Sequence, residues 1–430
     1  MKNKMEKIVS LAKSRGFIYP GSEIYGGLAN TYDYGPLGAE LLRNIKNLWW
    51  ERFVEQREEI FGIHTSILMN PKVWESSGHV ESFVDPLVEC KKCHKRFRED
   101  HLKDKAKCPD CGGELTEPKL FQGMFKTQIG ATENRGAEIY LRPETAQGMF
   151  VNFKNVINTQ RPSLPFGLAQ IGKGFRNEVT LGNFIFRTLE FDMMEIEYFI
   201  GPKEGEKYFE KWKKEMWKWL IDLGIDEKKL RWREHEKDER SHYSDRTEDI
   251  EYKFPFGWGE LYGLAYRSDY DLKNHSEKSG EDLRYHPEEG EPFFPHVVEP
   301  TFGANRTFLI TLLDGYNEEE GRVFLKLHPK LAPYKAAIFP LLANKPELVK
   351  KAREIYEDLI KKFPVAWDER GNIGKRYFAQ DEIGTPWCIT VDFDTLNDKS
   401  VTIRDRDTKK QDRIAIDKIA SFLENKISGK

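Results

Sequence analysis

Two stretches of the chain carry hydrophobic residues at helical spacing. Between Pro36 and Glu58 these residues are Leu37, Leu41, Ile45, Leu48, Trp49 and Phe53. Pro36 suits the first turn of such a helix. A second stripe predicts a helix over Glu204–Leu223, with lysines on its solvated face and Phe209, Trp212, Met216, Trp219 and Leu220 on its apolar face. Each predicted helix therefore has one face to bury.

Extended and mixed segments surround these two helices. Strands or extended chain are predicted at Gly62–Met69, within Gln122–Phe199, and at Leu261–Tyr270 and Glu299–Phe302. Thr307–Leu313 has the apolar character of a further helix. The polar, charge-dense stretch Arg231–Tyr252 predicts a loop-rich connection.

The pattern changes after His328-Pro329. Strand-like runs at Lys335–Leu342, Trp387–Phe393 and Ser400–Asp405 alternate with a helical run at Pro346–Lys362. Alternation of strand and helix over about a hundred residues is typical of a compact α/β unit. The sequence therefore predicts a separate C-terminal domain at residues 329–430.

Composition narrows the class of protein. The chain has 430 residues, of which 39% are hydrophobic and 32% charged, which fits two or three globular domains and excludes a disordered chain. No apolar run reaches the length of a membrane span, and the N-terminus lacks the apolar region of a signal peptide. We therefore expect a cytoplasmic protein with no membrane partner.

A net charge of −3 gives the whole molecule no general attraction for nucleic acid, so any such contact needs a local basic patch. One candidate patch contains Lys91, Lys92, Lys95, Arg96 and Arg98, and the other contains Arg404, Arg406, Lys409 and Lys410. An ordinary solvated charged face explains either patch equally well.

Four of the five cysteines have metal-ligand spacing. Two Cys-x₂-Cys pairs, Cys90/Cys93 and Cys108/Cys111, lie 14 residues apart in the segment Glu89–Pro118. Four thiolates suit tetrahedral Zn²⁺ in a closed structural site, which we prefer to free thiols. His94 and His101 are then expected to be solvated, because four sulfur atoms fill the shell. Cys388 has no partner and is expected to be a small buried residue.

Three short segments carry phosphate- and base-binding chemistry: Arg176-Asn177-Glu178, Arg187–Phe191 and Gly303–Arg306. Side chains alternate along a strand, so Arg176 and Glu178 share one face. A guanidinium can bind a phosphate, a carboxylate can accept from an amino group, and Phe191 offers a ring on which a base can stack. Two strands joined by a loop at Thr180–Phe186 would form half of an ATP site. The alternative is a cross-strand Arg176–Glu178 ion pair with Phe191 in the core.

These segments resemble motifs 2 and 3 of the class II aminoacyl-tRNA synthetases, and most closely the homodimeric glycyl-tRNA synthetases. Further stretches that share the resemblance are Asn70–His79, Leu141–Gly148, Gly263–Asp271, Glu299–Gly303 and Val401–Asp407. It extends from about Gly16 to the C-terminus. The phosphate loops GxxxxGK[ST] and GxGxxG are absent, as are the HIGH and KMSKS words of class I synthetases.

The resemblance implies an α+β fold. An antiparallel-sheet catalytic domain flanked by helices would occupy residues 1–88 and 119–328, interrupted by a zinc-binding insertion at 89–118. Residues 329–430 would form the anticodon-binding domain. The Pro36–Glu58 helix and Asn70-Pro71 resemble motif 1, which implies a homodimer interface. An ordinary buried helix is the alternative.

The resemblance also implies an activity, the ATP-dependent attachment of glycine to tRNA(Gly) through a glycyl-adenylate, with Mg²⁺ as a cofactor. Arg176 and Arg306 would be catalytic, holding the α- and γ-phosphates, and Glu260 would bind Mg²⁺. The implied ATP site contains Arg176, Asn177, Glu178, Phe186, Arg187, Thr188, Leu189, Glu190, Phe191, Glu260, Leu261, Gly303, Ala304, Asn305 and Arg306. The implied glycine site contains Arg98, Glu144, Phe191, Glu195, Glu299, Thr301 and Gly303.

Two other classes of function compete with a ligase. A non-catalytic relative could act as a nucleic-acid-binding accessory subunit, but such a protein has no need of Arg176, Arg187 and Arg306, which are all present. A zinc-ribbon binding module accounts for about thirty residues and leaves the rest of the chain unexplained. The sequence therefore favours the enzyme.

Overall fold

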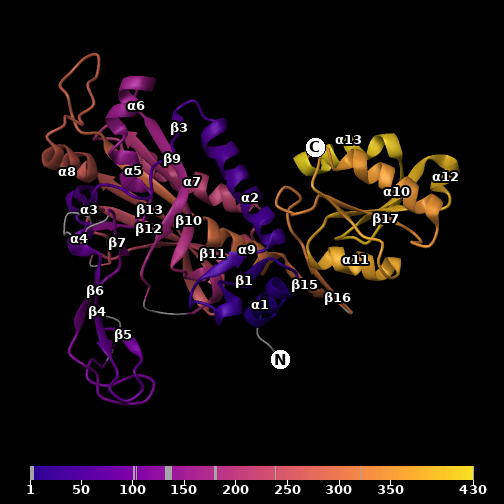
Figure 1. The fold of residues 1–430 in the computed structure, drawn as a ribbon. Helices are drawn as coiled ribbons and strands as arrows, with labels where there is room; N and C mark the ends of the chain where they lie inside the picture. Colours follow the sequence, from indigo (N-terminus) through magenta and orange to yellow (C-terminus); the bar gives the residue numbers. More distant parts are fainter. Residues whose placement is uncertain are drawn as a thin grey trace.

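The computed structural model describes residues 4–99, 102, 104–130, 138–178, 182–237, 239–319 and 321–429. The larger of its two bodies is built on a seven-stranded sheet (Figure 1). The strands, in spatial order, are β11 (Leu230–Glu234), β12 (Arg246–Phe254), β13 (Gly257–Ser268), β14 (His296–Gly303), β10 (Glu190–Ile200), β9 (Phe166–Phe175) and β3 (Ile60–Gly62). All neighbours are antiparallel except β3 and β9. This arrangement confirms the predicted antiparallel sheet.

Strand β10 separates the core from the face that carries polar groups. Met194, Ile196 and Tyr198 point into a hydrophobic core, whereas Glu195 and Glu197 alternate with them on the other face. Four helices complete the core: α1 (Lys4–Ser14), α2 (Pro36–Trp50), α7 (Gly205–Asp222) and α9 (Ala304–Gly315). One face of the sheet therefore packs on the main core, while the other face carries these carboxylates and, beside them, a second apolar cluster that includes Phe166 and Phe199.

Both helices predicted from hydrophobic spacing are confirmed. All five residues of the second stripe are buried along α7. Helix α2 ends at Trp50 and continues as a π-helical turn over Glu51–Glu55, with Leu48 partly exposed and the rest of its stripe buried in the core of the same chain. The apolar face of α2 is therefore used within one subunit, and any contact with a second subunit needs other residues.

Two local predictions, one of a loop and one of an extended segment, need correction. The stretch Arg231–Tyr252 is a loop only in part: residues 235–245 form the expected connection, and the other half of the stretch belongs to β11 and β12. Its charges misled the prediction because they pair across the strands, as in Arg231–Glu251 at 2.5 Å. Of the extended run at Gly62–Met69, only Gly62 lies in a strand; Leu68 makes a single β-bridge to Leu141.

The smaller body is the predicted α/β unit, with its own hydrophobic core. Its five-stranded sheet has the order β18 (Val365–Trp367), β17 (Ala336–Pro340), β19 (Trp387–Val391), β20 (Ser400–Asp405) and β21 (Gln411–Ala415). Figure 1 shows α10 (Pro346–Leu359) and α13 (Ile419–Ser428) on one face and α11 (Ile373–Glu382) on the other. Cys388 is buried in this unit, as predicted.

The second candidate basic patch is wrong for two of its members. Arg404 and Arg406 are buried, at 5% and 3% exposed. The Arg404 guanidinium donates to both oxygens of Asp381, at 2.9 and 3.0 Å, and Arg406 Nη1 donates to the Gly384 carbonyl at 2.7 Å. Their charges are used inside the domain because a buried carboxylate and buried carbonyls need donors.

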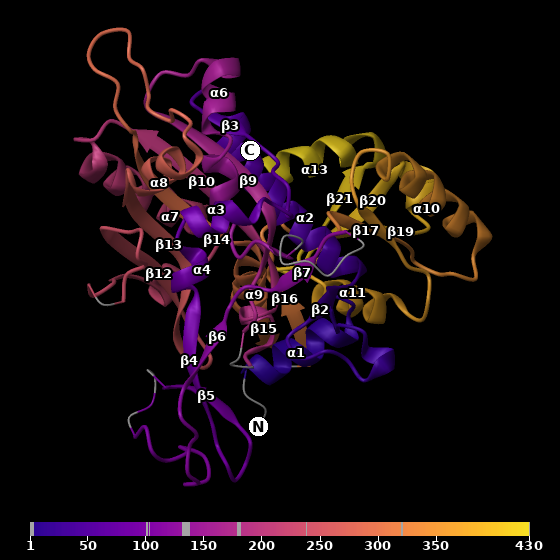
Figure 2. The same cartoon turned by 60° about the vertical axis from the view of Figure 1, so that its left-hand side comes forward.

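A small three-stranded sheet projects from the larger body, as Figures 1 and 2 show at the lower end of the molecule. Its order is β5 (Arg96–Arg98), β4 (Val84–Glu89) and β6 (Lys119–Gln122), and it carries the cysteine-rich segment. The first basic patch lies here, but acids of the same region neutralise much of it, as in Lys95–Asp110 at 2.6 Å and Arg96–Glu89 at 2.9 Å. No helix in the described parts of the chain is long and apolar enough to cross a membrane.

The remaining elements connect these units. The helices are α3 (Pro71–Ser76), α4 (His79–Ser82), α5 (Ala146–Phe150), α6 (Phe153–Gln160), α8 (Tyr270–Ser279) and α12 (Thr395–Asp398). The paired short strands are β1 (Ile18–Pro20) with β2 (Tyr32–Tyr34), β7 (Lys126–Gln128) with β8 (Glu138–Tyr140), and β15 (Tyr316–Glu319) with β16 (Arg322–Leu325).

Candidate active site

A cavity opens between the β9–β10 connection, β13 and the start of α9. It brings together most of the predicted ATP-binding residues: Arg176, Glu178, Phe186, Arg187, Thr188, Phe191, Glu260, Leu261, Gly303, Asn305 and Arg306. Thr301 from the predicted glycine site also lines it. Of the described residues in the ATP set, Asn177, Leu189, Glu190 and Ala304 adjoin the cavity in sequence but do not line it. Three segments far apart in the chain therefore form one site.

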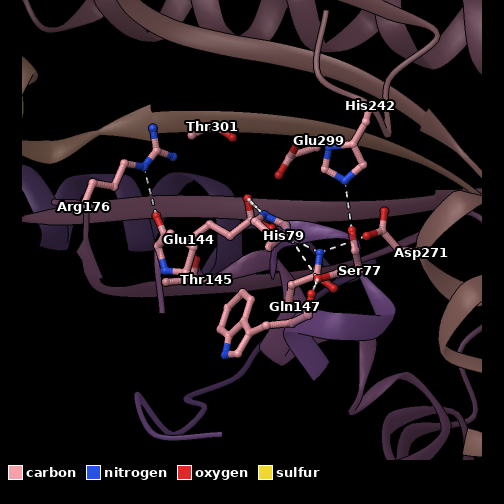
Figure 3. Close-up of polar contacts among 12 residues, drawn as sticks. Ser77, His79, Glu144, Thr145, Gln147, Arg176, His242, Asp271, Glu299 and Thr301 are labelled. Carbon is pink, nitrogen blue, oxygen red and sulfur yellow. Dashed lines mark hydrogen bonds and ion pairs between the residues drawn. The ribbon is translucent and has the colours of Figure 1, made fainter. Parts of the chain in front are cut away.

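Arg176 lies just beyond the end of β9 and is oriented by its surroundings. Its Nε donates to the Pro143 carbonyl at 3.2 Å (dashed line from Arg176 in Figure 3). Its guanidinium carbon lies 5.4 Å from the centre of the Phe191 ring. Glu178 does not form an ion pair with Arg176; its carboxylate is 3.9 Å from Arg187 Nε. The alternative of a cross-strand Arg176–Glu178 pair is therefore wrong, and Phe191 is only partly buried.

Arg306 faces the same cavity from the first turn of α9. Its Nη1 lies 3.0 Å from the Glu260 carboxylate and donates to the Glu260 carbonyl at 2.9 Å, while its Nε donates to the Phe186 carbonyl at 3.3 Å. The charge of Arg306 lowers the pKa of Glu260. The helix N-terminus adds its own positive end to this side of the cavity. Two oriented arginines therefore line one cavity.

Buried carboxylates from several elements gather beyond the cavity, and Figure 3 labels three of them, Glu144, Asp271 and Glu299. Glu195 accepts hydrogen bonds from the backbone and hydroxyl of Thr145 and lies 3.5 Å from the Thr301 hydroxyl. Glu144 accepts from Gln147 at 3.1 Å and lies 3.3 Å from His79 Nε2. The predicted glycine-binding acids therefore meet in one place.

Arg267 is the guanidinium of this acid cluster, and it is 0% exposed. It donates to Asp271 at 2.7 and 2.8 Å and to Glu299 at 3.0 and 3.1 Å, and it lies 3.8 Å from Glu144. Its guanidinium also packs 3.7 Å from the centre of the Tyr243 ring. The guanidinium of Arg267 is therefore a shared counter-charge for Asp271, Glu299 and Glu144.

The electrostatics of the cluster favour a further cation. Burial raises the pKa of Glu299 to about 8, against the opposing charge of Arg267, and burial also raises the pKa of Glu195. Burial alone would raise the pKa of Glu144, but His79 and Arg267 hold it well below its usual range. Glu197 is 0% exposed, and neither of its carboxylate oxygens has a hydrogen-bond partner among the described residues. Acidic groups therefore exceed the nearby positive charges.

Sequence reasoning and structure disagree on which residues belong here. Arg98 lies on β5 of the projecting sheet, with Nη1 2.9 Å from Asp85, and does not line the cavity. The sequence analysis gave no role to Arg267, His79 or Gln147. The spacing of Arg267 and Asp271, four residues apart at the end of a strand-like run, was the available signal for an ion pair.

The four spaced cysteines form a second candidate site. Their Sγ atoms all lie within 4.8 Å of one another, and none forms a disulfide. The backbone N–H of Cys93, 3.4 Å from the Cys90 sulfur, is the main cause that lowers the pKa of Cys90 to about 6. A Cβ on Gly113 would lie 2.9 Å from the same sulfur, so a glycine suits this turn. The donor set fits Zn²⁺.

Two histidines, His94 and His101, lie between the two cysteine pairs in the sequence. His94 is exposed and its ring lies 3.5 Å from Glu89, which agrees with the expected solvated position. His101 lies outside the described residues. The four cysteines by themselves offer the four ligands of a tetrahedral site.

Comparison with known proteins agrees with this geometry. Residues 125–315 match the family described as "tRNA synthetase class II core domain (G, H, P, S and T)", and residues 335–426 match "Anticodon binding domain". The fold is that of a class II tRNA synthetase, as the sequence analysis predicted.

Relatives narrow the class further. Proteins named glycine--tRNA ligase from Caldanaerobacter subterraneus subsp. tengcongensis and Acetivibrio thermocellus are each 52% identical, over 99% of this chain and 99% of their own. The protein of that name from Geobacillus thermodenitrificans is also 52% identical, over 99% of this chain and 98% of its own. The chain belongs to the glycine--tRNA ligase family.

Proposed function

We propose that this protein attaches glycine to tRNA(Gly) at the expense of ATP, through a glycyl-adenylate, in protein synthesis. The observation that carries the proposal is one cavity with Arg176 and Arg306 in its wall and the buried acid cluster next to it. An accessory nucleic-acid-binding role gives no reason for this arrangement. Since protein synthesis takes place in the cytoplasm, we propose that the enzyme works there.

Adenylate formation requires that a carboxylate attack the α-phosphorus of ATP and expel pyrophosphate. Arg176 would hold the α-phosphate, and Arg306 would hold the γ-phosphate beside the N-terminus of α9. Glu178 would accept from the adenine amino group, and the ring of Phe191 would stack on adenine. Positioning and charge neutralisation supply most of the catalysis in such a step, so no protein base is required.

The acid cluster would select glycine by its ammonium group. Glu144, Glu195 and Glu299 would surround this cation, which would offset part of the excess negative charge. The Thr301 hydroxyl lies 3.5 Å from Glu195, and its methyl group would narrow the space next to the α-carbon. Arg267 would keep Glu299 in place rather than touch glycine itself.

The first expected result is therefore strict selectivity for glycine. Glycine should support ATP–pyrophosphate exchange, whereas alanine and serine should give a kcat/KM at least about 100-fold lower, because the proposed pocket would leave no space for a side chain. Exchange assays with the three amino acids at matched concentrations measure this difference. Comparable exchange with alanine would remove the glycine assignment while leaving the ATP site intact.

Two metals belong to the proposal. Glu260 would take part in binding Mg²⁺ on the ATP phosphates, after its carboxylate is released from Arg306 by the nucleotide. Cys90, Cys93, Cys108 and Cys111 would bind one structural Zn²⁺ per chain, where four thiolates would tie the projecting segment together.

The expected result for zinc is one equivalent per chain, lost in acid or in a strong chelator because only thiolates bind the ion. Cys108→Ala should abolish binding, and the matched control Cys388→Ala should retain it, since Cys388 is buried in the other body. Exchange should persist in the zinc-free protein, because the cysteines lie outside the cavity. Elemental analysis that finds no metal in protein purified without chelators, with all four thiols titratable, would contradict the assignment.

The assembly and domain limits complete the proposal. We assign residues 1–88 and 119–328 to the catalytic domain, 89–118 to the insertion and 329–430 to the anticodon-binding domain. We also propose a homodimer in which the residues around Asn70-Pro71 take part. Large apolar side chains that are exposed in the single chain, Ile24, Tyr25, Leu28 and Leu68, offer material for its interface.

A further inference from the structure

The chain segment between the two bodies is fixed by many side-chain hydrogen bonds to its backbone. Residues 326–335 connect β16 to β17, and all of them except Lys335 fall between the matched segments 125–315 and 335–426. Backbone carbonyls of a surface connection are ordinarily left to water. Here the carbonyls of residues 327, 329, 330, 331 and 332 all accept hydrogen bonds from side chains. We call this segment the joint.

Lys335 holds three of these carbonyls. Its side chain is nearly buried, and its Nζ donates to Pro329 at 3.0 Å, Lys330 at 2.7 Å and Ala332 at 2.8 Å. An ammonium group has three donors, so all of them are used. No described carboxylate lies within ion-pair distance of it. A buried ammonium is stable only while such acceptors stay in place, so the lysine and the joint fix each other's position.

Asn44 reaches the same carbonyls from the other body. It projects from α2, and its Nδ2 donates to Leu331 at 3.1 Å and to Ala332 at 3.2 Å. The Ala332 carbonyl therefore accepts from Asn44 of the larger body and from Lys335, which leads directly into β17 of the smaller body. At the other end of the joint, Arg406 Nη2 donates to the Leu327 carbonyl at 3.0 Å.

A charged cluster supports that second end. Arg322 of β16 donates to Asp381 of α11 at 2.8 Å, and Arg404 donates to the same carboxylate. A strand that follows the catalytic helix α9 is thus tied to a helix of the C-terminal body. Both ends of the joint have fixed partners, which is the opposite of a flexible hinge.

We propose that Lys335 and Asn44 are positioning residues for the tRNA step, because they hold the C-terminal domain in one orientation relative to the active site. This inference rests on the proposed function. A tRNA is stiff, so if one of its ends is bound by the C-terminal domain, a small rotation at the joint displaces its other end from the adenylate. Misplacement of a reacting group by about 1 Å can cost a hundredfold in rate. Adenylate formation uses only the cavity and should not depend on the joint.

The test compares Lys335→Met and Asn44→Asp with the control Lys326→Met, which removes an exposed lysine of the same segment. For the first two variants we expect glycine-dependent exchange within twofold of wild type and kcat/KM for charging full-length tRNA(Gly) at least about tenfold lower. The control should match wild type in both assays. Small-angle scattering should show a broader distribution of distances between the domains for the first two variants alone.

Charging by both variants within twofold of wild type would overturn the proposal, and so would an equal loss of exchange and charging, since that reflects general damage. If Lys335→Met does not fold, Asn44→Asp decides, because it leaves the buried lysine and its acceptors in place. Absence of glycine-dependent exchange in the wild type would remove the proposed function instead. Scattering then still tests the joint, and a wild type as flexible as the variants would count against it.

Discussion

Arg176→Ala is expected to lower the turnover of adenylate formation by about 10²–10³-fold while the protein stays folded. The reason is that negative charge grows on the α-phosphate in the transition state, next to the position that Arg176 would occupy. A group used mainly in the transition state affects kcat as much as kcat/KM. Glycine-dependent pyrophosphate exchange measures the change, with circular dichroism as the check on folding.

Arg306→Ala is the natural comparison for this variant. Arg306 would hold the γ-phosphate, which leaves with pyrophosphate, so its loss should raise KM for ATP more than KM for glycine. The two arginines should therefore give different kinetic patterns although both line the cavity. A folded Arg176→Ala protein with near-normal exchange would refute the role proposed for that residue.

Arg267→Met should be the most destabilising single substitution in the acid cluster, with a loss of about 3–5 kcal/mol in the free energy of unfolding. The variant removes the guanidinium that donates to Asp271 and Glu299, which are 1% and 5% exposed, and leaves both carboxylates buried without their counter-charge. Denaturation in urea, followed by tryptophan fluorescence, measures the loss.

Arg231→Met is the matched control for this substitution. Arg231 pairs with Glu251 on the outer strands of the same sheet, but its side chain is 46% exposed, so its removal should cost less than about 1 kcal/mol. Equal losses for Arg231→Met and Arg267→Met would show that burial of the acid cluster does not set the cost.

Helices were the part of the fold most open to prediction from sequence. The stripe Phe209–Leu220 and the stripe that begins at Leu37 each place one face of a helix in the core, and hydrophobic spacing records that demand directly. The hydrophobic spacing could not show whether α2 packs within one chain or between two chains. A buried face within a chain and a buried face between chains leave the same pattern.

Charged residues were the part least open to prediction, because their partners lie far away in sequence. In the sequence, Arg404 resembled part of a surface patch, and only the fold shows that it forms a buried ion pair with Asp381. The same applies to Arg231 and Glu251, which pair across two strands in a stretch where a loop was predicted. Local sequence cannot distinguish a solvated charge from one that is matched across a sheet.

The candidate site divides in the same way. Arg176, Phe191 and Arg306 stood in recognisable segments, so their meeting in one cavity was expected. Arg267 stood in a recognised segment too, but its role depends on Asp271 and on Glu299, 32 positions away, and on complete burial. Glu197 carried no signal beyond its spacing of two from Glu195.

Strand β10 should tolerate substitutions of its side chains more readily than insertions or deletions of residues. Its odd-numbered positions from Phe191 to Glu197 face the site, and the even-numbered positions from Met194 to Ile200 face the core. A single inserted or deleted residue within the strand would exchange the two sets, placing carboxylates among Trp and Phe rings and apolar side chains beside the nucleotide. Substitutions can be selected one at a time here, whereas length changes must accumulate in the connections outside β9 and β10.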